Sequence, residues 1–163
     1  MWLNPKAVLS EQNGKEIEFF IQEVDDIVKK ISGQYEPDIA ECRITTLFRD
    51  HVKNKGGREV IATINKIGGR NKFFATHYFG KDFDCFLDIN IEYWRKFTET
   101  QKIALIHHEL LHIKGERDEN NELQRDKEGN IVWKIIIHDI EEFEKIKSIY
   151  GEWQTEELAE KSM

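Results

Sequence analysis

The chain has 163 residues, of which 39% are hydrophobic and 34% are charged, and its formal net charge is −7. This length predicts one domain spanning residues 1–163, large enough to bury a core. No apolar run approaches the roughly 18 residues that a membrane helix needs, so we expect no contact with a membrane. The acidic balance argues against general nucleic-acid binding.

Two features of the sequence predict a cytoplasmic protein. The N-terminus lacks the basic and apolar regions of a secretory signal. The only cysteines, Cys42 and Cys85, form no CxxC pair and are typical of buried strand residues in a reducing compartment.

The first predicted element is an amphipathic helix over residues 16–31, which Gly33 would end. Its apolar residues follow the 3.6-residue period: Ile17, Phe20, Ile21, Val24, Ile27, Val28 and Ile31. Residues 1–15 contain the breakers Pro5 and Gly14, so we expect a poorly ordered lead-in before the helix.

From residue 40 to residue 90 the apolar period changes to two, which favours β-strands. The predicted strands are residues 42–49, 60–67, 73–79 and 83–90. Gly68 and Gly69 indicate a hairpin turn, and the short connections predict an antiparallel meander.

Basic residues are in excess between Arg49 and Lys72, with only two acidic residues among them. The cations are Arg49, Lys53, Lys55, Arg58, Lys66, Arg70 and Lys72. Exposed hairpin turns commonly carry lysines, and no nucleic-acid module is recognisable. We therefore interpret this excess as solvent-exposed charge rather than as a nucleic-acid site.

The next predicted element is a helix from Glu99 to Lys114, which Gly115 would end. Thr98 and Gln101 have the spacing of a capping box, in which each side chain bonds the backbone of the other. Apolar residues occur on nearly every face of this helix, which predicts that it is buried.

This helix contains the motif His108-Glu109-Leu110-Leu111-His112. Residues four apart lie one above the other on a helix, so two imidazoles can bind one Zn²⁺. Glu109 is rotated by about 100° from His108 and can act as a base toward a metal-activated water. His107 has no histidine four residues on, so we interpret it as packing beside the ligands or supporting them by hydrogen bonding.

The C-terminal third begins with a strongly polar stretch, residues 116–129, which predicts an exposed loop. Residues 131–137 follow as a strand. A helix then runs from about residue 140 to Tyr150, with Asp139 and Glu142 as its cap. We expect residues 155–163 to be a poorly ordered tail.

A catalytic zinc site takes three protein ligands, and several residues are candidates for the third. His138 lies between an apolar strand and a capped helix, and we favour it. The alternatives are Asp118, which follows the motif in a His-x-x-Gly-x-x-Asp pattern, and the helical carboxylates Glu141 and Glu142. Asp139 could accept a hydrogen bond from a ligand imidazole.

The runs IALIHHELLHI and HDIEEF, and the preceding DFDCFLDINIEYWRKFTETQK, resemble the phage metallopeptidase family. The resemblance implies an origin in a phage or mobile element and a minimal zincin-like domain, distantly similar to SprT-like proteases. It also implies zinc ligation by His108, His112 and His138, with Glu109 as the base. We expect an α+β fold: an N-terminal helix, an antiparallel or mixed sheet of about four strands, the buried motif helix and a C-terminal helix.

The functional hypothesis is a zinc-dependent endopeptidase acting on a peptide or protein that adds as a strand to the sheet edge. Residues 83–90 lead into the motif helix and are our candidate for a strand near the site. The candidate oxyanion donors are His77, Tyr78, His107 and Tyr150. The alternative is a non-catalytic, zinc-stabilised protein-binding module, and the sequence leaves the oligomeric state open.

Overall fold

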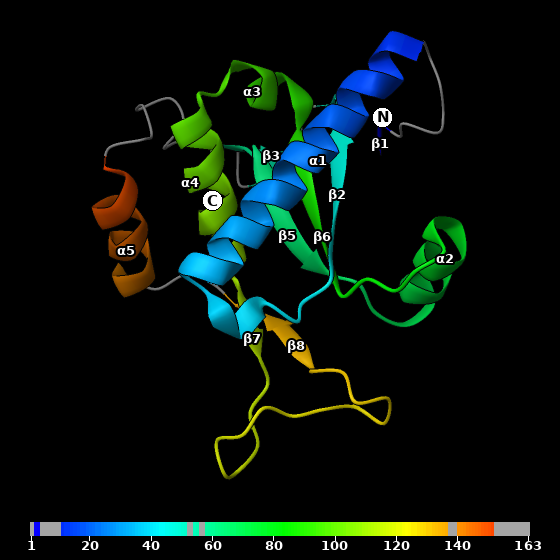
Figure 1. Cartoon of the computed structure of the whole chain (residues 1–163), viewed down its shortest axis with the longest axis vertical. Coiled ribbons are helices and arrows are strands. Elements are labelled where there is room, and N and C mark those ends of the chain that lie inside the picture. The colour runs from blue at the N-terminus through cyan, green and yellow to red at the C-terminus, as the bar shows by residue number, and fades with distance from the viewer. Residues whose placement is uncertain (1, 4–10, 52–53, 56–57, 137–139, 152–163) are drawn as a thin grey trace.

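The structure is a computed structural model, and it describes residues 2–3, 11–51, 54–55, 58–136 and 140–151. The predicted tail at 155–163 lies outside these ranges. The fold is α+β, as predicted, with helices beside a small mixed sheet (Figure 1). Among the described helices, none is long and apolar enough to cross a bilayer.

The described chain forms helices and mostly short strands. In order they are β1 (Trp2–Leu3), α1 (Glu11–Gln34), the 3-10 helix η1 (Pro37–Ile39), β2 (Ile44–Arg49), β3 (Asn54–Lys55), β4 (Arg58–Glu59), β5 (Ala62–Lys66), α2 (Gly69–Phe79), β6 (Cys85–Asn90), α3 (Ile91–Lys96), α4 (Glu99–Leu110), β7 (Ile113–Gly115), β8 (Trp133–Ile135) and α5 (Ile140–Tyr150).

The main sheet has the strand order β1-β2-β6-β5. Strand β6 runs parallel to β2 and antiparallel to β5, so the sheet is mixed and the predicted antiparallel meander is wrong. Strand β6 lies inside the sheet. Of the strands that the structure describes, β5 is therefore the edge strand on the side of the motif helix.

Helices α1 and α4 contact each other and together cover one face of this sheet (Figure 1). Helix α1 lies against β2, and α4 lies against β5. The buried apolar residues that fill the space between them include Val24, Ile31, Phe48, Ile64, Leu87, Ile89, Trp94, Leu105, Ile106 and Leu110. This core fixes the position of α4 relative to the sheet edge.

The N-terminal region is more ordered than the sequence predicts. Helix α1 begins at Glu11 rather than at residue 16 and continues through Gly33 to Gln34. Gly33 can be helical because the apolar face of α1 packs on the core up to the fully buried Ile31. Trp2 and Leu3 pair with β2, so part of the expected lead-in belongs to the sheet.

The predicted strand at residues 73–79 is wrong, because this segment belongs to helix α2. Gly68 caps the helix start instead of forming a hairpin, and Gly80 ends it with a φ of 74°. Aromatic and β-branched residues favour a strand here only if a neighbouring strand can cover them. Helix α2 projects from the body of the molecule (Figure 1), and Phe73 and Phe74 are exposed.

Helix α2 is attached to the sheet through polar contacts at its base. The Thr76 hydroxyl donates to Asp82 at 2.7 Å, and the Lys72 ammonium lies 3.9 Å from Asp84. Asp84 in turn accepts hydrogen bonds from the backbone and the guanidinium of Arg43.

The loop between β7 and β8 contains two turns of the same construction, offset by eight residues. Asp118 accepts hydrogen bonds from the backbone N–H groups of residues 120 and 122. Asp126 does the same with those of residues 128 and 130. Asn121 and Gly129 occupy the matching position of positive φ. The polar stretch is therefore an ordered double turn, although it is exposed as predicted.

Candidate metal centre

The motif helix α4 begins as the sequence predicts. The Thr98 hydroxyl accepts from the Gln101 N–H at 3.2 Å, and the Gln101 side chain accepts from the Thr98 N–H at 2.9 Å. These two bonds form the predicted capping box. Every residue from Ala104 to Leu111 is buried, which confirms the buried helix.

The helix ends earlier than expected, at Leu110 rather than near Lys114. The chain then turns through His112, and residues 113–115 pair as β7 with β8. The His112 carbonyl accepts a hydrogen bond from the Ile136 N–H at 2.8 Å. Pairing with β8 thus replaces the last predicted turn of the helix, and His112 lies at the junction.

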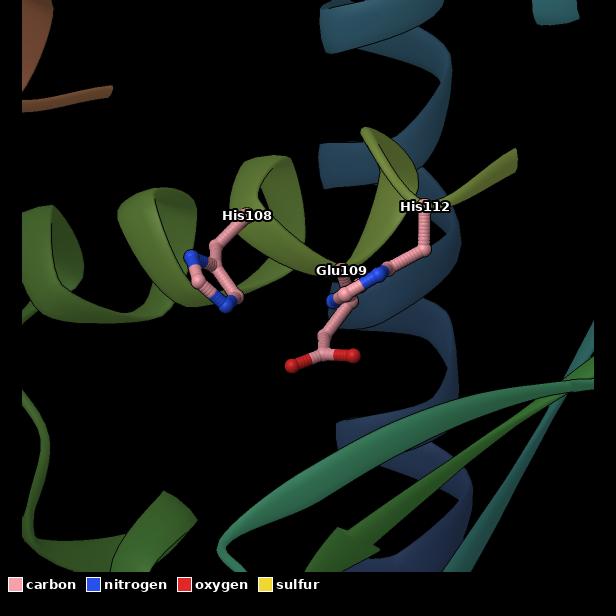
Figure 2. A group of neighbouring side chains, drawn as sticks. All are labelled: His108, Glu109 and His112. Atoms are coloured by element: carbon pink, nitrogen blue, oxygen red, sulfur yellow. The ribbon is translucent and has the colours of Figure 1, made fainter. Parts of the chain in front are cut away.

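The structure brings His108, Glu109 and His112 together at this end of α4. One possible ligand atom from each lies within 4.8 Å of the others. His108 and Glu109 are buried, and His112 is half-buried. The two imidazole rings have centroids 5.6 Å apart and planes at 79°. Figure 2 shows all three side chains on the same side of the helix end, facing the sheet.

The contacts of His112 suit a metal ligand. Its Nδ1 lies 2.6 Å from the carbonyl oxygen of Ile136. A carbonyl oxygen only accepts hydrogen bonds, so Nδ1 must carry the proton in this contact. The neutral ring then has its lone pair on Nε2, and the bond to Ile136 fixes the orientation of the ring. Two oriented imidazoles and a carboxylate fit a divalent transition metal such as Zn²⁺.

Glu109 is a buried carboxyl group, with 2% of its surface exposed. Burial raises its pKa well above the ordinary value of 4.5, and the negative charge of Asp88 raises it further. A hydrogen bond from the backbone of Ile64 in β5 partly offsets this and lowers the pKa of Glu109. A carboxyl with a raised pKa is a stronger base than an exposed one, which suits proton transfer near neutral pH.

The bond to Ile64 places Glu109 at the free edge of β5. In the antiparallel pair of β5 with β6, the Asn90 N–H donates to Ile61 and the Ile67 N–H donates to Asp84. Odd-numbered residues of β5 therefore bond to β6, and the backbone groups of the even-numbered residues point to the outer edge. Ile64 is one of these, so the base of the site lies against the edge of β5 that pairs with no other described strand.

A buried ion pair lies on the other face of the sheet from α4. Arg49 and Asp88 are 0% and 1% exposed, and Arg49 Nε donates to Asp88 at 2.6 Å. Arg49 also donates to the backbone carbonyls of His51 and Val60. The sequence interpretation counted Arg49 among exposed cations. Its alternation with apolar strand residues favoured an exposed position, and its buried partner Asp88 lies 39 positions away in the sequence.

Of the candidates for the third ligand, Asp118 is the one for which the structure describes both the backbone and the side chain. It is exposed in the first turn of the β7–β8 loop, and its Oδ1 is engaged with two backbone N–H groups. It is not brought to His108 and His112. His138 and its neighbour Asp139 lie outside the described residues. Glu141 and Glu142 lie in the first turn of α5, where the structure does not describe the side chains.

The residues predicted to support the ligands or to stabilise the oxyanion lie in two places, around His107 of α4 and on α2. His107 is fully buried, and its ring nitrogens contact Tyr150 at 2.8 Å and Glu36 at 3.1 Å. His77 is exposed on α2, and Tyr78 lies on the same helix with its side chain outside the described part. The sequence interpretation missed Glu36, because nothing in its neighbourhood marks a partner seventy residues away.

Comparisons with known proteins agree with this geometry. A family described as "Putative phage metallopeptidase" matches residues 20–162, which include α4 and every candidate ligand. No curated protein and no solved structure is significantly similar to the chain. Because the match covers most of the sequence and encloses the His108–Glu109–His112 group, the chain belongs to the phage metallopeptidase family.

Proposed function

We propose that this protein is a zinc-dependent endopeptidase. The observation that supports it best is the convergence of His108, Glu109 and His112 within 4.8 Å, beside the edge of β5 that pairs with no other described strand. Two imidazoles would hold Zn²⁺, while the buried Glu109 carboxylate beside them can serve as a base. A purely structural zinc site has no use for such a base.

Each residue of the group has a distinct role in this proposal. When bound, Zn²⁺ would supply Lewis-acid chemistry, polarising the scissile carbonyl and making a bound water more acidic. His108 and His112 hold the ion, and the Ile136 carbonyl keeps the His112 ring in the ligating tautomer. Glu109 accepts the proton of the attacking water and then delivers it to the leaving amine.

We propose His138 as the third ligand. Ile136 is bonded to His112 through both its N–H and its carbonyl. Two residues of chain span at most about 7 Å, so a residue two positions beyond Ile136 remains within reach of the same metal. Asp118 lacks such support, because its carboxylate is already used in a turn.

The substrate in this proposal is an extended segment of a peptide or protein. The outward-facing backbone groups of Ala62 and Lys66 can pair with an added strand. Such a strand would pass the Glu109 carboxylate, which lies against Ile64 between them. We further propose that the protein acts in the cytoplasm, where the neighbouring thiols of Cys42 and Cys85, whose Sγ atoms lie 3.8 Å apart, would stay reduced. An oxidising compartment would favour a disulfide between them.

The central test is Glu109→Gln, assayed for zinc content and for cleavage of a denatured protein substrate. We expect the variant to keep zinc and to lose at least about 100-fold in cleavage rate, the lower range for loss of a general base. Full peptidase activity in a zinc-loaded variant would exclude this mechanism. An inactive parent with bound zinc would instead favour the zinc-stabilised binding module.

A paired experiment tests the third ligand. After dialysis against a moderate chelator, we expect His138→Ala to lose zinc and Asp118→Ala to retain it, with the parent as reference. The opposite pattern would show that Asp118 completes the site and that our assignment of His138 is wrong.

A further inference from the structure

A polar cluster around the buried His107 joins three helical elements next to the metal centre. His107 on α4 contacts Glu36, which follows α1, and Tyr150 at the end of α5. Lys145 of α5 also bonds to Glu36. Helix α5 is therefore attached at two points, and Ile146 between them is 2% exposed. The Tyr35 ring lies 5.2 Å from the His107 ring and covers its other side.

The proton positions in this cluster follow from the partners. The Glu36 carboxylate can only accept, so His107 Nε2 carries a proton and donates to it. A neutral imidazole with its proton on Nε2 has its lone pair on Nδ1. Nδ1 of the neutral ring then accepts from the Tyr150 hydroxyl. Burial raises the pKa of Tyr150 to about 12, so that hydroxyl stays protonated. Each of the two hydrogen bonds that link Tyr150, His107 and Glu36 thus has one defined donor and one defined acceptor.

The chain leading into α5 is also attached to the motif, at its other end. Ile136 bonds to His112 in both directions, through its N–H and its carbonyl. Ile136 is thus bonded to the motif residue His112, and Lys145 is bonded to Glu36, the partner of His107. His108 lies between these two attachment points in the sequence.

We infer that Glu36, His107 and Tyr150 form a clamp that couples the docking of α5 to metal binding at His108 and His112. This inference rests on the proposed function. His107 and Tyr150 are positioning residues in it and do not touch the substrate or the metal. The clamp fixes the last turn of α4, and therefore the neighbouring His108, and it holds α5 against the site.

The coupling has a specific structural reason. His107 precedes the ligand His108 in α4, and α4 and α5 contact each other. Undocking α5 would remove the Tyr150 hydroxyl that orients His107 and would loosen the part of α4 that positions His108. Metal binding at His108 and His112 would then weaken. By linkage, binding the metal must stabilise the docked α5 by the same free energy.

The test is Tyr150→Phe, which keeps the ring and removes the hydroxyl that bonds to His107. Its matched control is Tyr93→Phe, which removes a tyrosine hydroxyl bonded to Glu59 at 3.1 Å, away from the clamp. We expect Tyr150→Phe to bind Zn²⁺ about tenfold more weakly, the lower range for loss of a residue that supports ligands. We expect Tyr93→Phe to bind like the parent.

Two further readouts separate positioning from general stability. In the Co²⁺-loaded proteins, Tyr150→Phe should show a weaker visible absorption than the parent, because loss of a protein ligand raises the coordination number. Zinc should slow hydrogen exchange of the α5 amides in the parent and much less in Tyr150→Phe. If Tyr150→Phe does not fold, Glu36→Gln replaces it with the same expectations.

The failures of the two proposals are distinguishable. Equal zinc affinity and equal Co²⁺ spectra in the parent and Tyr150→Phe would overturn the clamp and leave the peptidase proposal intact. A parent that binds neither Zn²⁺ nor Co²⁺ would overturn both.

Discussion

Helices α4 and α2 have nearly the same length but are stabilised in opposite ways. Helix α4 carries its own side-chain cap and is buried from Ala104 onward. Helix α2 starts at Gly68 without a side-chain cap and exposes two phenylalanines. Its base is attached by charges around Asp84. The difference shows that the precise geometry of the site depends on core packing, whereas α2 depends on a few polar bonds.

The largest effect should come from a cavity under α4. Leu110, which lies inside the motif, is 1% exposed in the main core. We expect Leu110→Ala to lower the free energy of unfolding by about 2–5 kcal/mol, because lost transfer energy and an unfilled cavity add together. Urea denaturation monitored by circular dichroism measures this loss in unfolding free energy. A loss below about 1 kcal/mol would show that α4 is not held by its packing.

A smaller and pH-dependent effect should come from the base of α2. Burial acts to raise the pKa of the Asp84 carboxyl, but hydrogen bonds from Arg43 outweigh it and hold that pKa below 3.8. A carboxyl with a lowered folded pKa stabilises the fold above the unfolded pKa, and this stabilisation is lost as pH falls through the folded pKa. We expect Asp84→Asn to cost about 1.5–3 kcal/mol at pH 7, the range for hydrogen bonds to charged groups.

The difference between Asp84→Asn and its parent should shrink as the pH falls below 3.8, and denaturant titrations at pH 7, 5 and 3 would show it. A difference that is constant over this range would mean that the carboxylate charge contributes nothing. Asp82→Asn is a useful comparison, because Asp82 is exposed and, among the described residues, bonds to the Thr76 hydroxyl and pairs with Arg43 at 3.7 Å.

The smallest effect should come from the exposed side of α2. Phe73 is 68% exposed, so Phe73→Ser removes little buried surface. We expect a change in unfolding free energy within about 0.5 kcal/mol, typical of surface substitutions. A loss comparable to that of Leu110→Ala would contradict the exposed position of α2.

The sequence predicted α4 well because its signals are local. The capping box involves residues three apart, and the metal-binding motif is complete within five residues. The same holds for strands β2, β5 and β6, whose alternating apolar residues match the observed faces. These features require no knowledge of distant partners.

Features that depend on distant partners could not be predicted. The parallel pairing of β2 with β6 follows from how the strands assemble, and α2 lacks a neighbouring strand that its aromatic residues would need. The partners of His107 are separated from it by 71 and 43 positions. The third ligand remains a prediction for the same reason, since its candidates lie outside the motif.

The double turn between β7 and β8 has a consequence for how this loop can change in length. Arg117 bridges to Leu123 and Arg125 to Ile131, so each turn is a closed unit with the same bridge. Each arginine also donates to the carbonyl of the positive-φ residue in its own turn. Because the construction recurs every eight residues, adding or deleting one whole unit preserves the phase of side chains on either side. Insertions of other lengths would displace Ile131 from the core. We therefore expect this loop to tolerate insertion of whole eight-residue units without a change in the position of the metal centre.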